Sequence, residues 1–358
     1  MRPSSLGPQQ TDYLMVMVYT GQGTVLLRSK FDWPHVWQEK KASTVGRAVD
    51  SVELSEAHPW RIFSLNLDEE DFAALDILMR KWNDPKERDH NGEWKLDSFR
   101  QVFVNYSSGK RDWKGDLQRI KRWQAFNPKS AGAAIAEAKY WAAYAWHIRG
   151  NETSTQADPV ALRVFGERMQ RAEKVLQEAK DFSVDNPLWY EAYLDIAVAT
   201  KRKDKFIEAL FNEAIRRHPH FQPLYLNMAK HWVPRSGDMA DWNKVDGVIK
   251  QAVSNAAEMD SASNYALLYA QISELQKFEF DLFRDSLVSW VKMRDSYEGL
   301  VKRYPSADNL NEFAAFACRA NDKSAYLNIR PLIKHIVPKK WPGNYSYDLC
   351  DRRFLQNV

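Results

Sequence analysis

Four segments of this chain end in a proline and share one apolar pattern before it. They are IKRWQAFNP, AKDFSVDNP, FNEAIRRHP and YEGLVKRYP, which end at Pro128, Pro187, Pro219 and Pro305. Apolar or small residues stand eight and five positions before each proline: Ile120 and Trp123, Ala179 and Phe182, Phe211 and Ala214, Tyr297 and Leu300. Because proline cannot continue a helix, each pattern predicts a helix that ends at its proline.

A new amphipathic run follows each proline, as in LWYEAYLDIAVAT after Pro187. This alternation indicates stacked helical hairpins, since one helical pair cannot bury its apolar face alone. FNEAIRRHP has the spacing of a tetratricopeptide second helix, and Pro187 and Pro219 lie 32 residues apart, against a repeat of about 34. The spacings of 59 residues from Pro128 to Pro187 and 86 from Pro219 to Pro305 make the repeats irregular. The sequence predicts a mainly α fold, an α-solenoid of tetratricopeptide-like hairpins.

The first 60 residues differ from the rest of the chain. YLMVMVYTGQGTVLLRSKF has two apolar runs around Gly21-Gln22-Gly23 and is compatible with a β-hairpin. RAVDSVELS, from Arg47 to Ser55, is compatible with a further strand. From Ser64 the apolar residues recur at helical spacing. We therefore expect an N-terminal segment over 1–60 with short strands and a helical-repeat domain over 61–358.

Two helix starts are predicted from side chains that can cap a helix. Asp68 precedes three acidic residues and an apolar stripe, and acidic residues favour the positive end of the helix dipole. In VPRSGDMADW, Asp238 or Ser236 is predicted to cap a helix that begins at Met239.

Composition limits the classes of protein that fit. Hydrophobic residues make up 44% of the 358 residues and charged residues 27%, which is typical of a soluble globular protein. The net charge of +4 gives little support for nucleic-acid binding. The apolar run Tyr13 to Tyr19 is far shorter than the roughly 20 residues of a membrane span, and no secretory cleavage site follows it. We expect a cytoplasmic protein, with the periplasm as the alternative if a leader preceded the chain.

The chain has two cysteines, Cys318 and Cys350. Cys318 lies in the apolar run FAAFACRA, so it is predicted to be a small buried hydrophobic residue. Two cysteines are too few for a disulfide scaffold, and their spacing fits no zinc pattern. No cofactor and no metal are predicted.

The stretch RHPHFQPLYLNMAKHW contains three histidines that raise the question of a metal site. Phe221, Leu224 and the following apolar residues form one helical stripe. His218 and His220 precede this helix and His231 lies near its end, roughly 17 Å away at 1.5 Å per residue. The three are predicted to be turn and helix-end residues, and a metal-dependent hydrolase in the His218/His220/His231 region stays as the alternative function.

Other chemistry has weaker support in the sequence. We find no Gly-rich phosphate loop, no Gly-x-Ser-x-Gly elbow and no His-Glu-x-x-His motif. KRDWKGDLQRIKRWQ, from Lys110 to Gln124, carries six Lys or Arg and two Trp. Trp113 and Trp123 fall on its apolar face with most charges off it, so an amphipathic helix is favoured and a nucleic-acid binder is the second alternative.

Three runs carry a family resemblance: RWQAFNPKSAGAAIAEAKYWAAYAWHIRG, YLNMAKHWVPRSGD and YPSADNLNEFAAFACRANDKSAY. They resemble a bacterial family of unknown function with tetratricopeptide-like helical folds, through Trp123 to Ser130, Ala145 to Gly150 and Pro234-Arg235, over roughly residues 64 to 345. Members often carry Trp-Gly-Gly where this chain has Ser236-Gly237. The resemblance implies a fold and no catalytic residues; by analogy of fold, it implies a partner-binding scaffold, such as an immunity protein beside a secreted toxin.

Two regions are candidates for contact with a protein partner. The loop Val233 to Trp242 contains Arg235, which suits a carboxylate, and Asp238. The end of the helix before Gly150 offers a polar rim with Trp141, Trp146 and Arg149 nearby. From all these features we expect a non-enzymatic protein-binding scaffold, most specifically a bacterial immunity protein that neutralises a secreted toxin.

Overall fold

The computed structural model describes residues 12–20, 23–31, 59–104, 112–150, 158–233, 241–256, 258–276, 280–342 and 345–355. The chain divides into two compact units, Met1–Ala57 and His58–Val358, and each is described by itself. In the first unit, β1 (Asp12–Thr20) and β2 (Gly23–Phe31) pair antiparallel. They occupy the two apolar runs that the sequence makes compatible with a hairpin. The further strand expected at 47–55 lies outside the described residues.

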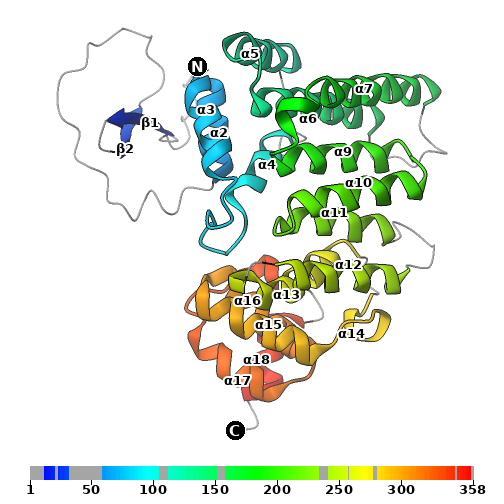
Figure 1. Cartoon of the computed structure of the whole chain (residues 1–358). Helices are drawn as coiled ribbons and strands as arrows, with labels where there is room; N and C mark the ends of the chain where they lie inside the picture. Colours follow the sequence, from blue (N-terminus) through cyan, green and yellow to red (C-terminus); the bar gives the residue numbers. More distant parts are fainter. Residues whose placement is uncertain are drawn as a thin grey trace, which may run out of the picture. The chain divides into compact units, whose positions relative to one another are not determined.

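The second unit is mainly α, as predicted, and its described residues form 17 α-helices and three 3-10 helices. Figure 1 shows α9 to α12 stacked one against the next. None of the described helices has the length and apolarity to cross a bilayer. The α-helices are α2 (Pro59–Asp68), α3 (Phe72–Lys81), α4 (Ser98–Val104), α5 (Trp113–Phe126), α6 (Ala131–Arg149), α7 (Pro159–Glu178), α8 (Lys180–Ser183), α9 (Pro187–Ala199), α10 (Asp204–Arg217), α11 (Gln222–Trp232), α12 (Trp242–Asn255), α13 (Glu258–Glu274), α14 (Leu282–Asp285), α15 (Trp290–Arg303), α16 (Ala307–Arg319), α17 (Lys323–Ile329) and α18 (Tyr347–Leu355). The 3-10 helices are η1 (Lys95–Asp97), η3 (Arg330–Leu332) and η4 (Pro338–Lys340).

Proline and capping side chains fix where helices begin. α9 starts at Pro187, where the missing N–H costs little, and the Asn186 side chain accepts the Leu188 amide at 3.0 Å. At the start of α6, the Ser130 hydroxyl oxygen accepts the Ala133 amide at 3.0 Å. These local signals explain why the predicted proline turns coincide with helix boundaries.

Two predicted caps were wrong. Asp68 is the last residue of α2, and after a turn with φ of 57° at Glu70, Asp71 caps α3. The cap of α12 is Asp241 rather than Asp238 or Ser236, which lie outside the described residues. In both places several polar residues that can cap stand close together.

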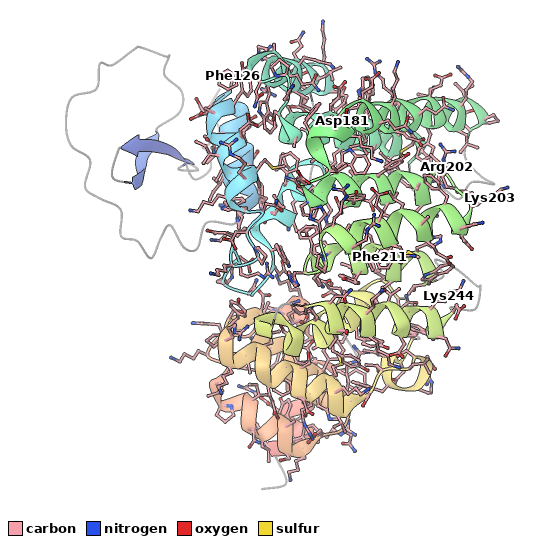
Figure 2. All side chains as sticks on the ribbon, in the orientation of Figure 1. Phe126, Asp181, Arg202, Lys203, Phe211 and Lys244 are labelled. Atoms are coloured by element: carbon pink, nitrogen blue, oxygen red, sulfur yellow. A yellow bond between two sulfur atoms is a disulfide. The ribbon has the colours of Figure 1, made fainter. Side chains whose placement is uncertain are left out.

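Large aromatic side chains fill the spaces between neighbouring helices, and Figure 2 shows how densely side chains occupy these spaces. Trp123, Tyr225 and Tyr297 are fully buried. The Trp189 indole N–H, also buried, donates to the Leu176 carbonyl at 2.8 Å, which satisfies the one polar atom of that side chain. Many aromatic residues of the sequence therefore form the core between the stacked helices.

Residues 83–97, which we call the 83–97 segment, contact helices far away in the sequence. Trp94 is buried edge-to-face against Phe221 at the start of α11. The Asn309 side chain at the start of α16 donates to the Asn91 carbonyl at 3.0 Å. Buried Trp94 and Leu96 make the 83–97 segment part of the core.

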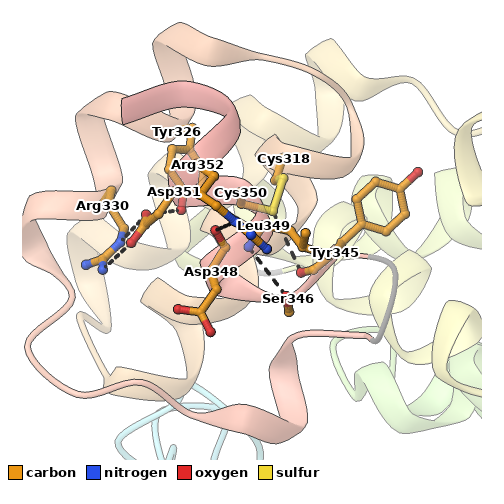
Figure 3. Close-up of a disulfide and its surroundings, with 10 residues drawn as sticks. All are labelled: Cys318, Tyr326, Arg330, Tyr345, Ser346, Asp348, Leu349, Cys350, Asp351 and Arg352. Carbon is orange, nitrogen blue, oxygen red and sulfur yellow. Dashed lines mark hydrogen bonds and ion pairs between the residues drawn. A yellow bond between two sulfur atoms is a disulfide. The ribbon is translucent and has the colours of Figure 1, made fainter. Parts of the chain in front are cut away.

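A disulfide joins Cys318 on α16 to Cys350 on α18 (Figure 3). Cys318 is buried, as predicted, but its role as a lone hydrophobic residue is corrected because it is covalently bonded. Next to the disulfide, Asp351 accepts hydrogen bonds from Arg330 at 2.8 Å and from the Tyr326 hydroxyl at 2.6 Å. Helix α18 is thus attached to α16 covalently and to α17 and η3 through these polar bonds.

Candidate functional site

The histidines before α11 contact two different parts of the chain. His218 Nε2 lies 2.8 Å from the Val184 carbonyl oxygen, and His220 Nδ1 lies 2.7 Å from the Asn255 carbonyl oxygen. Burial lowers the pKa of His218, which favours its neutral form. The His218 ring therefore contacts the end of α8, and the His220 ring contacts the end of α12.

The third histidine, His231, lies at the other end of α11. This helix has 11 residues and is about 16 Å long at 1.5 Å per residue. His231 Nε2 contacts Asp204 Oδ1 at 3.2 Å, at the start of α10. The described residues contain no group of three or more His, Cys, Asp or Glu arranged to hold a metal ion. The geometry gives no support to a metal site that combines the three histidines.

The candidate residues at the end of α6 fall on different sides of the helix. The Arg149 guanidinium stacks over the Trp146 ring at 4.7 Å and near Phe165 at 5.2 Å. Trp141 is buried under the Arg171 guanidinium at 4.0 Å, outside the hollow that Trp146 lines. Trp146 and Arg149 therefore lie together and Trp141 does not join them. The other two candidates, Arg235 and Asp238, lie outside the described residues.

A hollow of about 320 Å³, which we call the first hollow, lies between α6, α9 and α11. Small side chains such as Ala142, Ala143, Ala192 and Ala199 form much of its wall, together with Trp146. Its polar residues are Arg100, Lys139, Asp195, Asn227, Lys230 and His231. The run of alanines in α6 and α9 explains the space, because larger residues at those positions would fill it.

Two of the three Lys and Arg side chains in the first hollow have carboxylate partners. Arg100 on α4 donates from Nε and Nη2 to Asp97 at 3.3 and 3.2 Å, and its Nε lies 3.9 Å from Glu191 Oε1. Lys139 on α6 forms an ion pair with Glu191 on α9. Both Lys139 and Glu191 are buried, so each needs the other to offset its lost hydration.

Asp195 and Lys230 face the same hollow from α9 and α11. Asp195 accepts a hydrogen bond from the Asn227 side chain at 3.0 Å. Asp195 is exposed, but partial loss of hydration beside the neighbouring helices, and then the Glu191 carboxylate, raise its pKa. Loss of hydration on partial burial, and then the positive charge of Arg100, lower the pKa of Lys230. Each shift weakens the charged form of its own group.

Two further hollows continue from the first one along the helices. The second hollow, about 200 Å³, shares Arg100 and Asn227 with the first. The third hollow, about 360 Å³, shares Glu93, Gln101 and Gln271 with the second and reaches α13, α16 and η4. The three form one adjoining series lined by α6, α9, α11, α13 and α16 in turn.

The third hollow is rich in carboxylates. Glu93 lines this hollow. Loss of hydration, and then the negative charge of Asp89, raise the pKa of Glu93 to about 7. Lys340 pairs with Glu312 at 2.5 Å and lies 3.6 Å from Glu274. The charges of the series therefore change along its length, from mostly cationic in the first hollow to mostly acidic in the third.

The helix considered for nucleic-acid binding is α5. Lys121 pairs with Glu137 at 2.7 Å, and the Arg122 side chain pairs with Glu70. Trp123 is fully buried and donates to Asp76, so it cannot stack on a base. Cations that already have carboxylate partners are poor phosphate ligands.

Comparison with protein-family models, with curated proteins and with solved structures finds no match to this chain. The sequence analysis did not single out Lys139, Asp195 or Lys230. Lys139 and Glu191 had a usable signal, because each is a charged residue with apolar neighbours inside a mostly apolar helix. Lys230 had none, since a lysine near a helix end is ordinary.

Proposed function

We propose that this chain is a non-enzymatic protein-binding scaffold whose binding surface is the series of three hollows. The observation that carries this proposal is that the hollows adjoin along five helices. A groove of this kind suits an extended or helical segment of a partner. The change of charge along the series would set the direction in which the segment lies.

We infer that the helices of the second unit are irregular tetratricopeptide-like hairpins. The proline turns at Pro187 and Pro219 support this, as does the use of α9 and α11 to line the hollows while α10 lines none of the three. Stacked hairpins present the first helix of each pair on one shared face. This is the arrangement that partner binding along a groove requires.

The resemblance in the sequence adds a more specific form of this proposal, an immunity protein that binds and neutralises a secreted toxin. Its test is co-expression with the product of the neighbouring gene. The immunity role predicts that cells survive the toxic product only when this chain is present. Equal killing with and without the chain would contradict the immunity role and leave the scaffold to be tested separately.

The scaffold is tested by photo-crosslinking in the cells that make this protein. A photoreactive residue replaces Asn227, which lines the first and second hollows, or Asn212, which is exposed on α10 and lines none of the three. We expect one protein to be crosslinked from position 227 and not from 212. That protein, once purified, should bind the parent chain and bind an Asn227→Trp variant at least tenfold more weakly. Crosslinks that form equally from both positions would overturn the proposal.

A further inference from the structure

Lys230 is a charged residue of the first hollow that forms no ion pair with another described residue. Among the described residues, no carboxylate oxygen lies within ion-pair distance of its amino group, and its side chain is half-buried. Asp195, across the hollow, already accepts a hydrogen bond from Asn227. A half-buried lysine gains from an anion that replaces part of its lost hydration.

Lys230 differs from the other two cationic side chains that line the first hollow. Three cationic side chains line the first hollow, Arg100, Lys139 and Lys230, against one lining carboxylate, Asp195. Arg100 is paired with Asp97 and Lys139 with Glu191, while Asp195 accepts a hydrogen bond from Asn227, so Lys230 is the lining cation that has no ion pair among the described residues.

The rest of the first hollow is apolar. Ala142, Ala143, Val198 and Met169 line it beside Trp146. A space of about 320 Å³ accommodates an aromatic ring or branched aliphatic group with a short linker, and burial of such a group is favourable.

We propose that the first hollow binds a carboxylate carried on a small apolar body, with the carboxylate on Lys230 Nζ and the apolar body against Trp146 and the alanines. The acid is either free or part of a partner's binding segment. Because a free acid needs no partner protein, binding is measured on the isolated chain, and its outcome is independent of the crosslinking test.

The first measurement is isothermal titration calorimetry with 3-phenylpropanoate as the probe. We expect one molecule to bind per chain. The neutral 3-phenylpropanamide and the cationic 3-phenylpropylamine have the same ring and chain length, and each should bind at least tenfold more weakly, because a charge-assisted hydrogen bond is lost. Equal binding of acid and amide, or no binding of the acid, would overturn the proposal.

Variants then locate the site. Lys230→Met keeps most of the side-chain volume and removes the charge, and it should weaken 3-phenylpropanoate at least tenfold. Lys230→Arg should restore most of the binding. Lys205→Met is the matched control, because Lys205 is exposed on α10 and lines none of the three hollows. Circular dichroism and the melting temperature confirm that each variant folds. Unchanged binding by a folded Lys230→Met variant would refute the assignment.

A substitution in the apolar wall tests the position of the ring. Ala143→Leu adds bulk to the hollow from α6, where residue 143 is only partly buried and the fold is not expected to suffer. It should abolish measurable binding of the acid and leave the melting temperature within a few degrees of the parent. Retained affinity in this variant would place the acid elsewhere and contradict the proposal.

The source of the carboxylate is distinguished with peptides. A peptide that ends in phenylalanine with a free carboxylate is compared with its amidated form and with 3-phenylpropanoate. If the peptide with a free carboxylate binds at least tenfold more tightly than 3-phenylpropanoate, and the amidated peptide does not bind more tightly, the carboxylate comes from a partner chain. If the peptide binds no more tightly, the ligand is a free acid; either result supports the carboxylate site.

Discussion

Asp76 is a buried carboxylate on α3 that organises the turn between α5 and α6. It accepts hydrogen bonds from Trp123 Nε1 at 3.1 Å, from Asn127 Nδ2 at 2.6 Å and from the Ser130 hydroxyl at 2.5 Å. Ser130 is itself the cap of α6. One side chain therefore determines both where α5 ends and how α6 begins.

We predict that Asp76→Ala lowers the free energy of unfolding by about 2–4 kcal/mol, because it leaves buried donors without an acceptor. Urea denaturation followed by far-UV circular dichroism measures this change. The control is Asp181→Ala on α8, an exposed carboxylate, which should stay within about 0.5 kcal/mol of the parent. A loss as small as that of the control would show that the network at Asp76 adds no stability.

Gly132 allows α6 to approach the Trp123 ring. A methyl group added at Gly132 would lie 2.8 Å from a Trp123 ring carbon and 2.9 Å from Met79 Cγ. Gly132→Ala should therefore lower the unfolding free energy by about 1–3 kcal/mol through overpacking. Gly166 on α7 has open space at the same position, so Gly166→Ala should raise it by up to about 1 kcal/mol. Both are measured by urea denaturation, and equal effects would refute the packing argument.

At the scale of elements, α18 is held in place by its contacts with α16, α17 and η3, which come before it in the chain. The disulfide attaches it to α16, and the polar bonds of Asp351 attach it to α17 and η3. Only Cys350 and Phe354 of this short helix are buried. A nine-residue helix with so small an apolar face is not stable alone, so its attachments determine whether it forms.

Replacing both cysteines by serine should lower the unfolding free energy by about 3–4 kcal/mol, because a crosslink across 32 residues restricts the unfolded chain. The parent protein in a reducing agent should match the double variant in denaturant titrations. The contrary result is a parent whose stability does not change although thiol titration shows that its cysteines have been reduced.

The ion pair of Asp351 predicts a pH dependence. Partial burial raises the pKa of this carboxyl, but hydrogen bonds from Arg330 and Tyr326 outweigh it and lower the pKa overall. A folded-state pKa below the unfolded value of about 3.9 stabilises the protein above that pH. Asp351→Asn should cost about 1 kcal/mol at pH 7. The difference from the parent should shrink below about pH 4, as the folded Asp351 protonates; a difference that is constant with pH would contradict this account.

At the scale of the whole second unit, the 83–97 segment connects helices that a simple stack would keep apart. Asn91 and Asn309 are 218 residues apart in sequence yet hydrogen-bonded. In a linear repeat protein each pair contacts only its neighbours, so parts of the stack can unfold separately. Contacts of the segment with both α11 and α16 should make unfolding more cooperative.

Trp94→Ala tests this cooperativity. The substitution empties a buried aromatic site and should cost about 3–5 kcal/mol. We expect one calorimetric transition in the parent, with equal calorimetric and van't Hoff enthalpies, and separated transitions in the variant. Trp113→Ala, on α5 and away from the segment, should keep a single transition. A single transition in Trp94→Ala would show that the segment does not couple the helices.

Local features of the fold were predictable and long-range ones were not. Pro187 ends one helix and starts another through its own backbone chemistry, so the sequence alone locates this boundary. The disulfide depends on how α16 and α18 meet, which no spacing encodes. Lys139 and Glu191 could be suspected from their apolar surroundings, but their pairing, and the isolation of Lys230, follow from helix packing alone.

The disulfide closes a covalent ring of polypeptide that contains α17, η3 and η4. Lys339 and Lys340, which line the third hollow, belong to this ring. A protease that cuts once inside it, for example after the exposed Lys334, releases no fragment. The nicked chain migrates as one species on a denaturing gel until a reductant is added, so after such a cut α18 still cannot be lost from the molecule.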